Sequence, residues 1–488
     1  METMNRRDLL RAGVFCGVVA TAGCSGDERS DNEEENDTDE SEMQNGTEDT
    51  PTETEPTEDT PEDSNLVTVS SEGGTVTAIV ESTEETVRQG SDSRAVIQAA
   101  IDHVEEGIVS LNSGTYTIVG EPLVAHSGVT LEGAGPSESV LRLGDELHDD
   151  AHNVLFADGG SENDSGVVIR DLTIEGNEAA NREIDPYPDV PPASGIIVQG
   201  EGVTVTNLRV HDTIRSNVVL EGTNSELREL ELSNSATDHW IYLADAVSCT
   251  IEDVHASGFI RGGGIVFGTS DQTCRDNSVR NVSIENVTAP PHEDTLPSDP
   301  LNREFPLMVA TFRSDGDVGG NTLSNLAVGP PDGPFNHRIV VAQPDATLSE
   351  VTFEGPVGYT HNVVQVGDSR ESSDVQGTLI KNVTLDVNDS GDRSNPSVIE
   401  ILDSGVSVEG IEVQASVERH TGVSVDGRYR SVRDVRLQDI TVNTERAALV
   451  AEGHENSVLE LSVESFVDVA ESGVETSGEV SFEVREID

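Results

Sequence analysis

The sequence predicts an all-β protein whose main body is a parallel β-helix, a solenoid of about a dozen turns. Two observations support this prediction. One short apolar and polar pattern recurs eleven times between residues 167 and 463, and a second strand-like pattern lies between consecutive copies. No helical periodicity separates the copies. A unit that cannot bury its apolar face alone stacks on its neighbours, so each repeat should form one turn of the solenoid.

Each copy of the first pattern has an apolar residue, two mostly polar residues including Asp, Asn or Glu, and then apolar, polar and apolar residues. Apolar residues at a period of two, with one break, indicate a short strand that bends. We call the middle apolar residue the marker, and successive markers are 22 to 44 residues apart. The markers are Leu172, Leu208, Leu230, Val254, Val282, Leu326, Val351, Val383, Ile411, Val435 and Leu461.

The second pattern is a five-residue apolar strand, as in Ser194-Gly-Ile-Ile-Val and His239-Trp-Ile-Tyr-Leu. Strand alternation directs the third and usually the fifth residue into the core and the fourth outward. The expected outward residues are Ile197, Val219, Tyr242, Val266, Val340, Val364 and Ser424.

The first 24 residues indicate an export signal rather than folded structure. They contain a twin arginine (Arg6, Arg7), a short apolar run and Thr21-Ala-Gly-Cys24, which resembles a lipoprotein cleavage box whose cysteine becomes lipidated. Residues 25–64 hold 18 acidic residues against one arginine, so we expect a disordered stalk. The β-helix domain should then occupy residues 65–488, outside the cell and attached to the membrane only through the lipid on Cys24. Simple cleavage and release is the alternative.

The charge of the chain excludes one class of function and suggests a habitat. The formal net charge is −65, one lysine stands among 27 arginines, and aromatic residues make up only 3%, a balance that resembles proteins of extreme halophiles. No basic stripe is present, so nucleic-acid binding is not expected. We interpret the charge as a hydrated surface that keeps the protein soluble.

The sequence offers no metal-ligand spacing, so we expect no metal and no other cofactor, although bound calcium stays open. Cys249 and Cys274 lie one repeat apart, and stacked turns could bring them together in a disulfide. The oligomeric state is not predicted.

A helix should precede the first turns, because residues 96, 97, 100, 101 and 104 form one apolar face, with Asp92 or Ser93 as its N-cap. With Gly114-Thr-Tyr-Thr-Ile118 and Gly128-Val-Thr-Leu-Glu-Gly-Ala-Gly135, this helix resembles the start of the pectate-lyase-like (pectin lyase fold) superfamily. The resemblance covers residues 75–488 and implies a right-handed β-helix capped by this helix. It implies no single activity, because the superfamily includes lyases, hydrolases, epimerases, esterases, tailspikes and proteins without known catalysis. The Gly-His-Gly, Arg-Ile-Lys and Trp-x-Asp-His signatures of individual branches are absent.

Two long excursions, Asn177–Ala193 and Thr288–Pro306, should flank a trough about three turns wide, with equivalent side chains roughly 5 Å apart on adjacent turns. The repeats align titratable or polar residues in this trough. The candidate catalytic residues are His211, Asp212, Arg215, Asp238, His239 and Arg261, and the candidate substrate-binding residues are Glu175, Trp240 and Tyr242.

Two reaction types fit these residues: hydrolysis by paired carboxylates, or elimination with an Arg, His or Tyr base. Each residue also has a structural alternative. Asp212 and Asp238 can bond turn amides, the arginines can pair with surrounding acids, and Trp240 can pack against a loop instead of stacking on a sugar. The predicted function is the binding and the cleavage or modification of an extracellular polysaccharide. The rival hypothesis is a non-catalytic rod that binds glycans or adheres to surfaces.

Overall fold

The structure of the protein is a computed structural model. The chain divides into two units, Met1–Glu62 and Asp63–Asp488. The predicted signal with Cys24, and almost all of the predicted stalk, fall in the first unit, outside the described residues. The structure describes residues 65–147, 150–159, 166–181, 193–260, 262–268, 272–288, 307–313, 316–330, 337–357, 363–367, 375–389, 397–415, 421–427, 431–443, 449–453, 459–468, 474–477 and 480–484.

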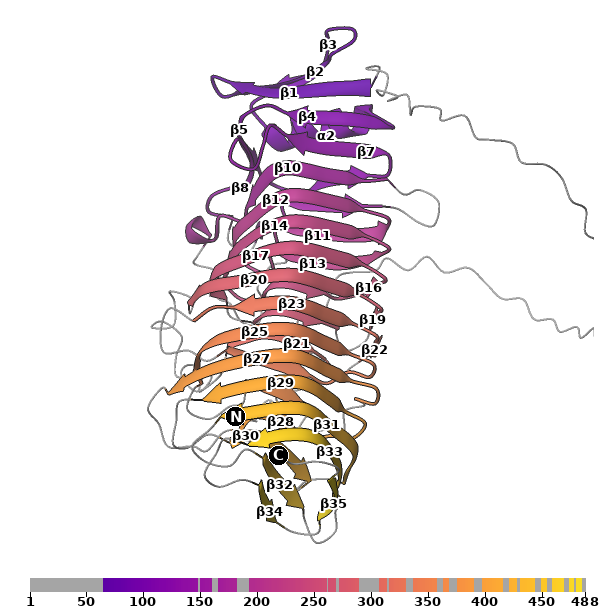
Figure 1. Cartoon of the computed structure of the whole chain (residues 1–488). Coiled ribbons are helices and arrows are strands. Elements are labelled where there is room, and N and C mark those ends of the chain that lie inside the picture. The colour runs from indigo at the N-terminus through magenta and orange to yellow at the C-terminus, as the bar shows by residue number, and fades with distance from the viewer. Residues whose placement is uncertain are drawn as a thin grey trace, which may run out of the picture. The chain divides into compact units, whose positions relative to one another are not determined.

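The second unit is a right-handed parallel β-helix, as the sequence predicts (Figure 1). Its strands form two long sheets, of 19 and 16 strands, and the chain alternates between them as it winds. Sheet A contains β1 (Leu66–Glu72), β2 (Thr75–Val80), β3 (Glu85–Gly90), β4 (Gly107–Leu111), β5 (Gly114–Ile118), β7 (Val129–Gly133), β8 (Ser139–Leu143), β10 (Val168–Glu175), β12 (Thr204–Thr213), β14 (Glu226–Ser235), β17 (Thr250–Ile260), β20 (Ser278–Thr288), β23 (Thr322–Val328), β25 (Thr347–Val357), β27 (Leu379–Asp389), β29 (Ser407–Ala415), β31 (Val432–Asn443), β33 (Leu459–Asp468) and β35 (Val480–Val484).

Sheet B carries the second pattern of the repeat. It contains β6 (Leu123–His126), β9 (Leu155–Asp158), β11 (Ile196–Glu201), β13 (Val218–Thr223), β15 (His239–Leu243), β16 (Ala246–Val247), β18 (Gly263–Phe267), β19 (Thr273–Arg275), β21 (Leu307–Phe312), β22 (Asp317–Gly319), β24 (His337–Val341), β26 (Val364–Val366), β28 (Ser397–Ile401), β30 (Thr421–Gly427), β32 (Leu449–Gly453) and β34 (Val474–Ser477).

The markers stack in register along sheet A. Leu172 pairs with Leu208, Leu208 with Leu230, and the series continues through Ile411. The prediction that Val435 stacks on Ile411 is wrong, because Ile411 pairs with Ile440. Strand β31 contains the apolar pattern twice, and the second copy is the one that stacks on β29.

The polar residue just before each marker explains the bend in the pattern. In eight successive strands this residue is Asp, Asn or Glu, and its φ lies between 50° and 58°. Asn and Asp tolerate this left-handed conformation better than most side chains. Their side chains also bond between turns: Asn207 donates to Asp171 (2.6 Å), Asn281 to Asp253 (2.9 Å) and Asn325 to Asn281 (2.9 Å). The eight residues are Asp171, Asn207, Glu229, Asp253, Asn281, Asn325, Glu350 and Asn382.

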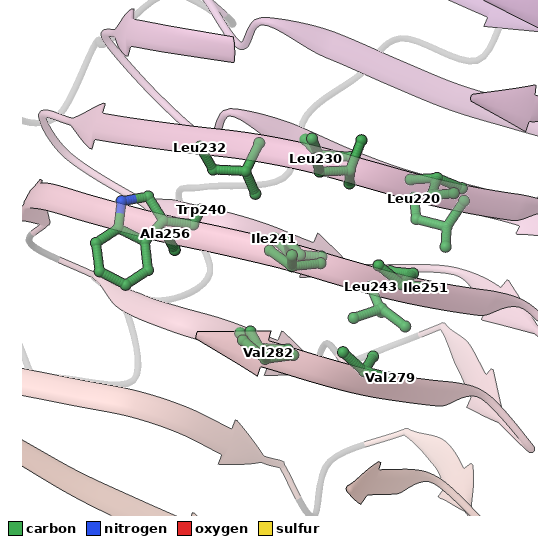
Figure 2. Packing of buried hydrophobic residues seen from close by; sticks show 14 of the residues in the cluster. Leu220, Leu230, Leu232, Trp240, Ile241, Leu243, Ile251, Ala256, Val279 and Val282 are labelled. Carbon is green, nitrogen blue, oxygen red and sulfur yellow. The ribbon is translucent and has the colours of Figure 1, made fainter. Parts of the chain in front are cut away.

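The core lies between the two sheets and is filled mainly by aliphatic side chains of the described turns, of which Figure 2 shows a part. Phe267 and Phe312 stack within it, with ring centroids 4.3 Å apart. Of the predicted outward residues, Val364 faces the core instead, because it pairs with the buried Ile339 while Gln365 pairs with Val340. Val219 and Val266 occupy the outward column but are 7% and 1% exposed.

The predicted helix is present at the start of the β-helix as α2 (Ser93–His103). The Asp92 carboxylate accepts a hydrogen bond from the Ala95 amide (3.0 Å), which makes Asp92 the N-cap. Val96, Ile97, Ala100 and Ile101 are buried in the core. Strand β1 pairs in parallel with β4 and antiparallel with β2, so the first turn does not end in an open strand edge. No helix among the described residues is long and apolar enough to cross a membrane.

Candidate functional site

A line of polar side chains runs along the outer face of sheet A, one from each successive turn. Arg142 on β8 pairs in register with Glu175 on β10, Glu175 with His211 on β12, and His211 with Ser233 on β14. Ser257 and Glu285 follow on β17 and β20. We call this line the polar track, and we extend the name to Gly329 and Glu354 on the next two turns. Neighbouring members are one strand spacing apart, about 4.8 Å.

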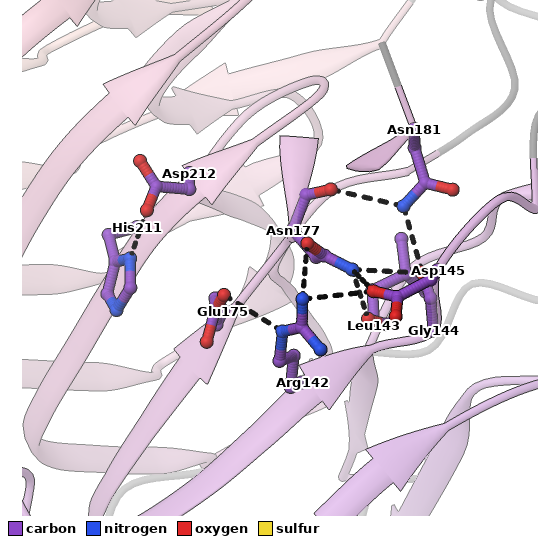
Figure 3. Close-up of polar contacts among 9 residues, drawn as sticks. All are labelled: Arg142, Leu143, Gly144, Asp145, Glu175, Asn177, Asn181, His211 and Asp212. Carbon is purple, nitrogen blue, oxygen red and sulfur yellow. Dashed lines mark hydrogen bonds and ion pairs between the residues drawn. The ribbon is translucent and has the colours of Figure 1, made fainter. Parts of the chain in front are cut away.

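His211 and Asp212 form the most specific pair at this face. His211 Nδ1 lies 2.8 Å from Asp212 Oδ2, and the two side chains are 21% and 38% exposed (Figure 3). The hydrogen bond from His211 is the largest cause that lowers the pKa of Asp212, while burial acts against it. Bonding from Asn234 and the charges of His211 and Arg209 lower the pKa further.

Asp212 is held by a ladder that spans three turns. Asp212 and Asn234 both have left-handed φ values, 53° and 54°, at the same corner of the helix, and Gly258 occupies this corner on the next turn with a φ of 78°. Asn234 Nδ2 lies 2.7 Å from Asp212 Oδ1, and the Phe259 backbone N–H donates to Asn234 Oδ1 (3.1 Å). Asp212 therefore accepts from the side chain of Asn234 on the next turn and orients His211 as well.

The ladder also determines which nitrogen of His211 carries the proton. A backbone N–H can only donate, so Asn234 must accept through Oδ1 and donate through Nδ2. Asp212 then accepts on both oxygens, once from Asn234 and once from the Nδ1–H of His211. In neutral His211 the lone pair is consequently on Nε2, the nitrogen away from Asp212. An imidazole arranged in this way can act as a general base.

Arg142, which we did not predict, occupies the turn beside Glu175. Its Nε donates to Glu175 Oε1 (3.0 Å), and its Nη2 bonds Asn177 Oδ1 (2.8 Å) and lies 3.0 Å from Asp145 Oδ1. Figure 3 shows Glu175 lying between Arg142 and His211. Strand alternation in Ser139-Val-Leu-Arg-Leu143 would have placed Arg142 outward, but β8 precedes the first marker and lay outside the repeat alignment.

Arg209 is a second cation at this face that sequence reasoning missed. It lies on β12, two residues before His211, and its Nη2 is 3.4 Å from Glu231 Oε1 on the next turn. It is 45% exposed, and its charge contributes to lowering the pKa of Asp212. The face around His211 therefore contains two arginines, Arg142 and Arg209.

Arg215, Asp238, His239 and Tyr242 form a separate group at the corner that leads into sheet B. Arg215 Nε lies 3.8 Å from Asp238 Oδ2. His239 is only 6% exposed, and its Nδ1 is 3.2 Å from the Gly263 carbonyl oxygen. Burial lowers the pKa of His239 to about 4. His239 and Tyr242 have ring centroids 5.0 Å apart, and the Arg313 guanidinium lies 5.8 Å over the Tyr242 ring.

The structure treats the other candidate residues in different ways. Asp212 lies opposite Asn234, while Asp238 belongs to the separate group with Arg215. Trp240 is 0% exposed and lies in the core, where it cannot stack on a sugar (Figure 2). Arg261 lies outside the described residues, as do most of the two excursions that were predicted to wall the trough.

The two cysteines of the body are free and buried. Both contact Asn277: its Oδ1 accepts from the Cys249 amide (2.9 Å), and its Nδ2 lies 3.5 Å from Cys274 Sγ. The disulfide between them, which the sequence left open, is therefore absent from the structure. Among the described residues no group of three or more His, Cys, Asp or Glu side chains could hold a metal ion.

Comparison with known proteins gave structural neighbours but no sequence relatives. No protein family and no curated protein matches the chain. The A-module of a mannuronan C-5 epimerase from Azotobacter vinelandii has 18% identity, with 80% of this chain and 95% of that chain covered and a TM-score of 0.43. A mutant tailspike protein of E. coli bacteriophage HK620 has 12% identity, with coverage of 80% and 76% and a TM-score of 0.48. The catalytic domain of an alpha-1,3-glucanase of the GH87 type has 12% identity, with coverage of 80% and 66% and a TM-score of 0.43. The description of the fold rests on the strand pairings and not on these likenesses.

Proposed function

We propose that this protein binds an acidic polysaccharide along the polar track and removes a proton from one of its uronate units with His211. The single observation that supports the proposal is the His211–Asp212 pair, which the Asn234 ladder fixes with His211 Nε2 directed away from its partner. A general base needs a defined tautomer and an accessible lone pair, and His211 meets both requirements.

The arginines on the face around His211 favour a substrate that carries carboxylates. Arg209 lies two residues before His211 on β12, and Arg142 lies two turns away with Glu175 between them. The two guanidinium groups are 45% and 30% exposed, and each is already balanced in part by a glutamate. An Arg–carboxylate contact is charge-assisted, and at molar salt, where the Debye length is about 3 Å, such short-range contacts persist while long-range repulsion is screened.

The chemistry follows from the position of the proton. The hydrogen on the carbon beside a uronate carboxylate is acidified when a cation neutralises that carboxylate, so His211 Nε2 would take the proton while an arginine contacts the carboxylate. The electron pair left on carbon can form a C=C bond and expel the glycosidic oxygen on the neighbouring carbon, and the proton that His211 has taken then passes to the leaving oxygen. Alternatively the carbon takes a proton from water on the opposite face, and His211 returns its proton to the solvent. The first outcome is elimination and the second is epimerisation.

We also propose that the protein acts outside the cell, attached to the membrane through Cys24 and separated from it by residues 25–64. This proposal rests on the sequence of the export signal and on the composition of residues 25–64. Mass spectrometry of the mature protein tests it, since lipidation predicts a new N-terminus at Cys24 with attached acyl chains. An N-terminus beyond Cys24 would favour release instead.

The experiment that tests the catalytic proposal incubates the full mature chain in molar salt with neutral and uronate polysaccharides. Three products are followed: unsaturated uronate by absorbance, new reducing ends, and deuterium incorporated into the sugar from heavy water. We expect activity on uronate polysaccharides only. The product should be either an unsaturated uronate or a uronate that has incorporated deuterium.

A matched pair of variants identifies the base. His211→Asn should lower the rate at least 100-fold. His255→Asn should leave the rate unchanged, because His255 on β17 is exposed on the same face of sheet A as His211 but lies outside the ladder. Equal rates for both variants would remove His211 from the mechanism. Reducing ends without unsaturation or deuterium would indicate a hydrolase, and no product across the panel would favour the glycan-binding rod.

A further inference from the structure

A hollow of about 170 Å³ opens in the outer face of sheet A, where β20, β23 and β25 lie side by side. Its volume equals that of roughly six water molecules at about 30 Å³ each. Its lining includes Ser283, Glu285, Ala327, Gly329, Thr352 and Glu354, and none of its lining residues is basic. The hollow lies on the polar track, four turns beyond His211, which corresponds to about 19 Å along the helix axis.

The hollow exists because β23 and the residue after it present small side chains between larger ones. Ala327 pairs with Ser283 on one side and with Thr352 on the other, and Gly329 lies between the turns that carry Glu285 and Glu354. Each neighbouring turn therefore rises above this one, and the two glutamates stand on opposite rims.

The backbone does not require glycine at position 329. Its φ is not in the left-handed region, and a Cβ added there would meet only Ile284 O at 3.6 Å and Glu285 Cγ at 3.8 Å, both ordinary contacts. Gly258 on the same face differs, because its φ is 78° and a Cβ would lie 2.2 Å from Asn234 Oδ1. The fold thus requires a glycine at 258 but leaves position 329 free, and the glycine there keeps the hollow open.

The lining determines what the hollow can hold. Two carboxylates about 10 Å apart across two strand spacings, together with the hydroxyls of Ser283 and Thr352 on the same two turns, offer hydrogen-bond acceptors on both sides of the hollow. A sugar unit with hydroxyl or amino donors satisfies them. A uronate unit would bring a third carboxylate between two others without any guanidinium to neutralise it.

We propose that this hollow is a binding subsite for a sugar unit that carries no acid group, in the same polymer whose uronate unit lies at His211. The inference rests on the proposed function and specifies its substrate class: a heteropolysaccharide that combines uronate units with neutral or amino sugars. The arginines at one end of the track and the glutamates at the other then select different units of one chain.

The test measures binding by isothermal titration calorimetry, with the full mature chain in molar salt. Two probes are compared, a homopolymer of uronate and a heteropolysaccharide whose three-sugar repeat has one uronate and two neutral or amino sugars, so that the fourth unit from a uronate carries no acid group. The wild type should bind the heteropolysaccharide at least 10-fold more tightly than the homopolymer. Gly329→Leu, which fills the hollow, should remove this preference and leave binding of the homopolymer unchanged.

Control variants separate the subsite from folding and from catalysis. Gly329→Ala should keep most of the preference, because one methyl group has room and leaves most of the volume open. Glu285→Gln and Glu354→Gln should each weaken binding of the heteropolysaccharide by about 3- to 10-fold. His211→Asn should retain the preference even though turnover is lost, so failure of the catalytic proposal would not mimic failure of the subsite. Equal binding of both probes by the wild type, binding of neither probe, or an unchanged preference in Gly329→Leu would each overturn the inference.

Discussion

Gly258→Ala tests the ladder that connects the fold to His211. An alanine at 258 must adopt a φ of 78°, which costs an L-residue about 1–2 kcal/mol. Its Cβ would also lie 2.2 Å from Asn234 Oδ1, so the amide must move away from both the Phe259 amide and Asp212. Losing these two hydrogen bonds costs about 1 kcal/mol each. The free energy of unfolding should therefore fall by about 3–4 kcal/mol.

The assay is denaturant unfolding in molar salt, with Gly329→Ala as the matched control on the same face. The control should change the free energy by less than about 1 kcal/mol, because its Cβ meets no atom closer than 3.6 Å. Combining Gly258→Ala with Asn234→Ala removes the clash, so the second substitution should cost less in the alanine background than in the wild type. If Gly258→Ala unfolds like Gly329→Ala, the ladder does not hold the corner, and the argument that it fixes the His211 tautomer fails.

Three further predictions concern buried groups. Burial lowers the pKa of His239 from 6.5 to about 4, so the unfolded chain binds the proton first as the pH falls. About 3 kcal/mol of the free energy of unfolding is therefore lost between pH 6.5 and pH 4. The free energy of unfolding should change less with pH in His239→Gln, and an identical pH dependence in both proteins would contradict the burial. Trp240→Ala should cost about 3–5 kcal/mol, and the fluorescence of this single tryptophan should not respond to added polysaccharide; a response would place the indole at the surface. Burial raises the pKa of Cys274 to about 12 and raises that of Cys249, so a thiol reagent should label both only after denaturation, and labelling of the native protein would show that the core opens.

The repeat could be predicted from the sequence because two physical constraints leave a visible pattern. Apolar residues must alternate along each strand. The residue just before each marker must tolerate a left-handed backbone, so Asn and Asp recur at that position. Where β31 contains this pattern twice, both Asp434 and Asp439 take positive φ values, and only the pairing with β29 distinguishes the copies. No local rule could make that choice.

The candidate site was predictable only where it follows the corner. His211 and Asp212 are neighbours in the chain at a turn, so their contact is local, and the repeat alignment brought Glu175 beside His211. Trp240 was misjudged because alternation from Ile241 directs it outward. The sequence did contain one signal that Trp240 is buried. In the inward column of sheet A, the small Ala256 lies between Leu232 and Ile284 and leaves volume for a large side chain from another strand. Arg142 was missed because β8 precedes the repeats.

The column of left-handed residues just before the markers also indicates where two adjacent turns are most sensitive to salt. A solenoid is a row of nearest-neighbour joints, and a joint with an amide donor between two turns is stronger than a joint without one. Glu229 and Asp253 place two carboxylates on adjacent turns, while the joints on either side include Asn207 or Asn281. Repulsion across this joint is screened in about 1 M salt, where the Debye length is about 3 Å, but not at 0.1 M, where it is about 10 Å. Because β14 also carries Asn234, dilution should weaken the contact between the turns that keep Asp212 bonded to His211.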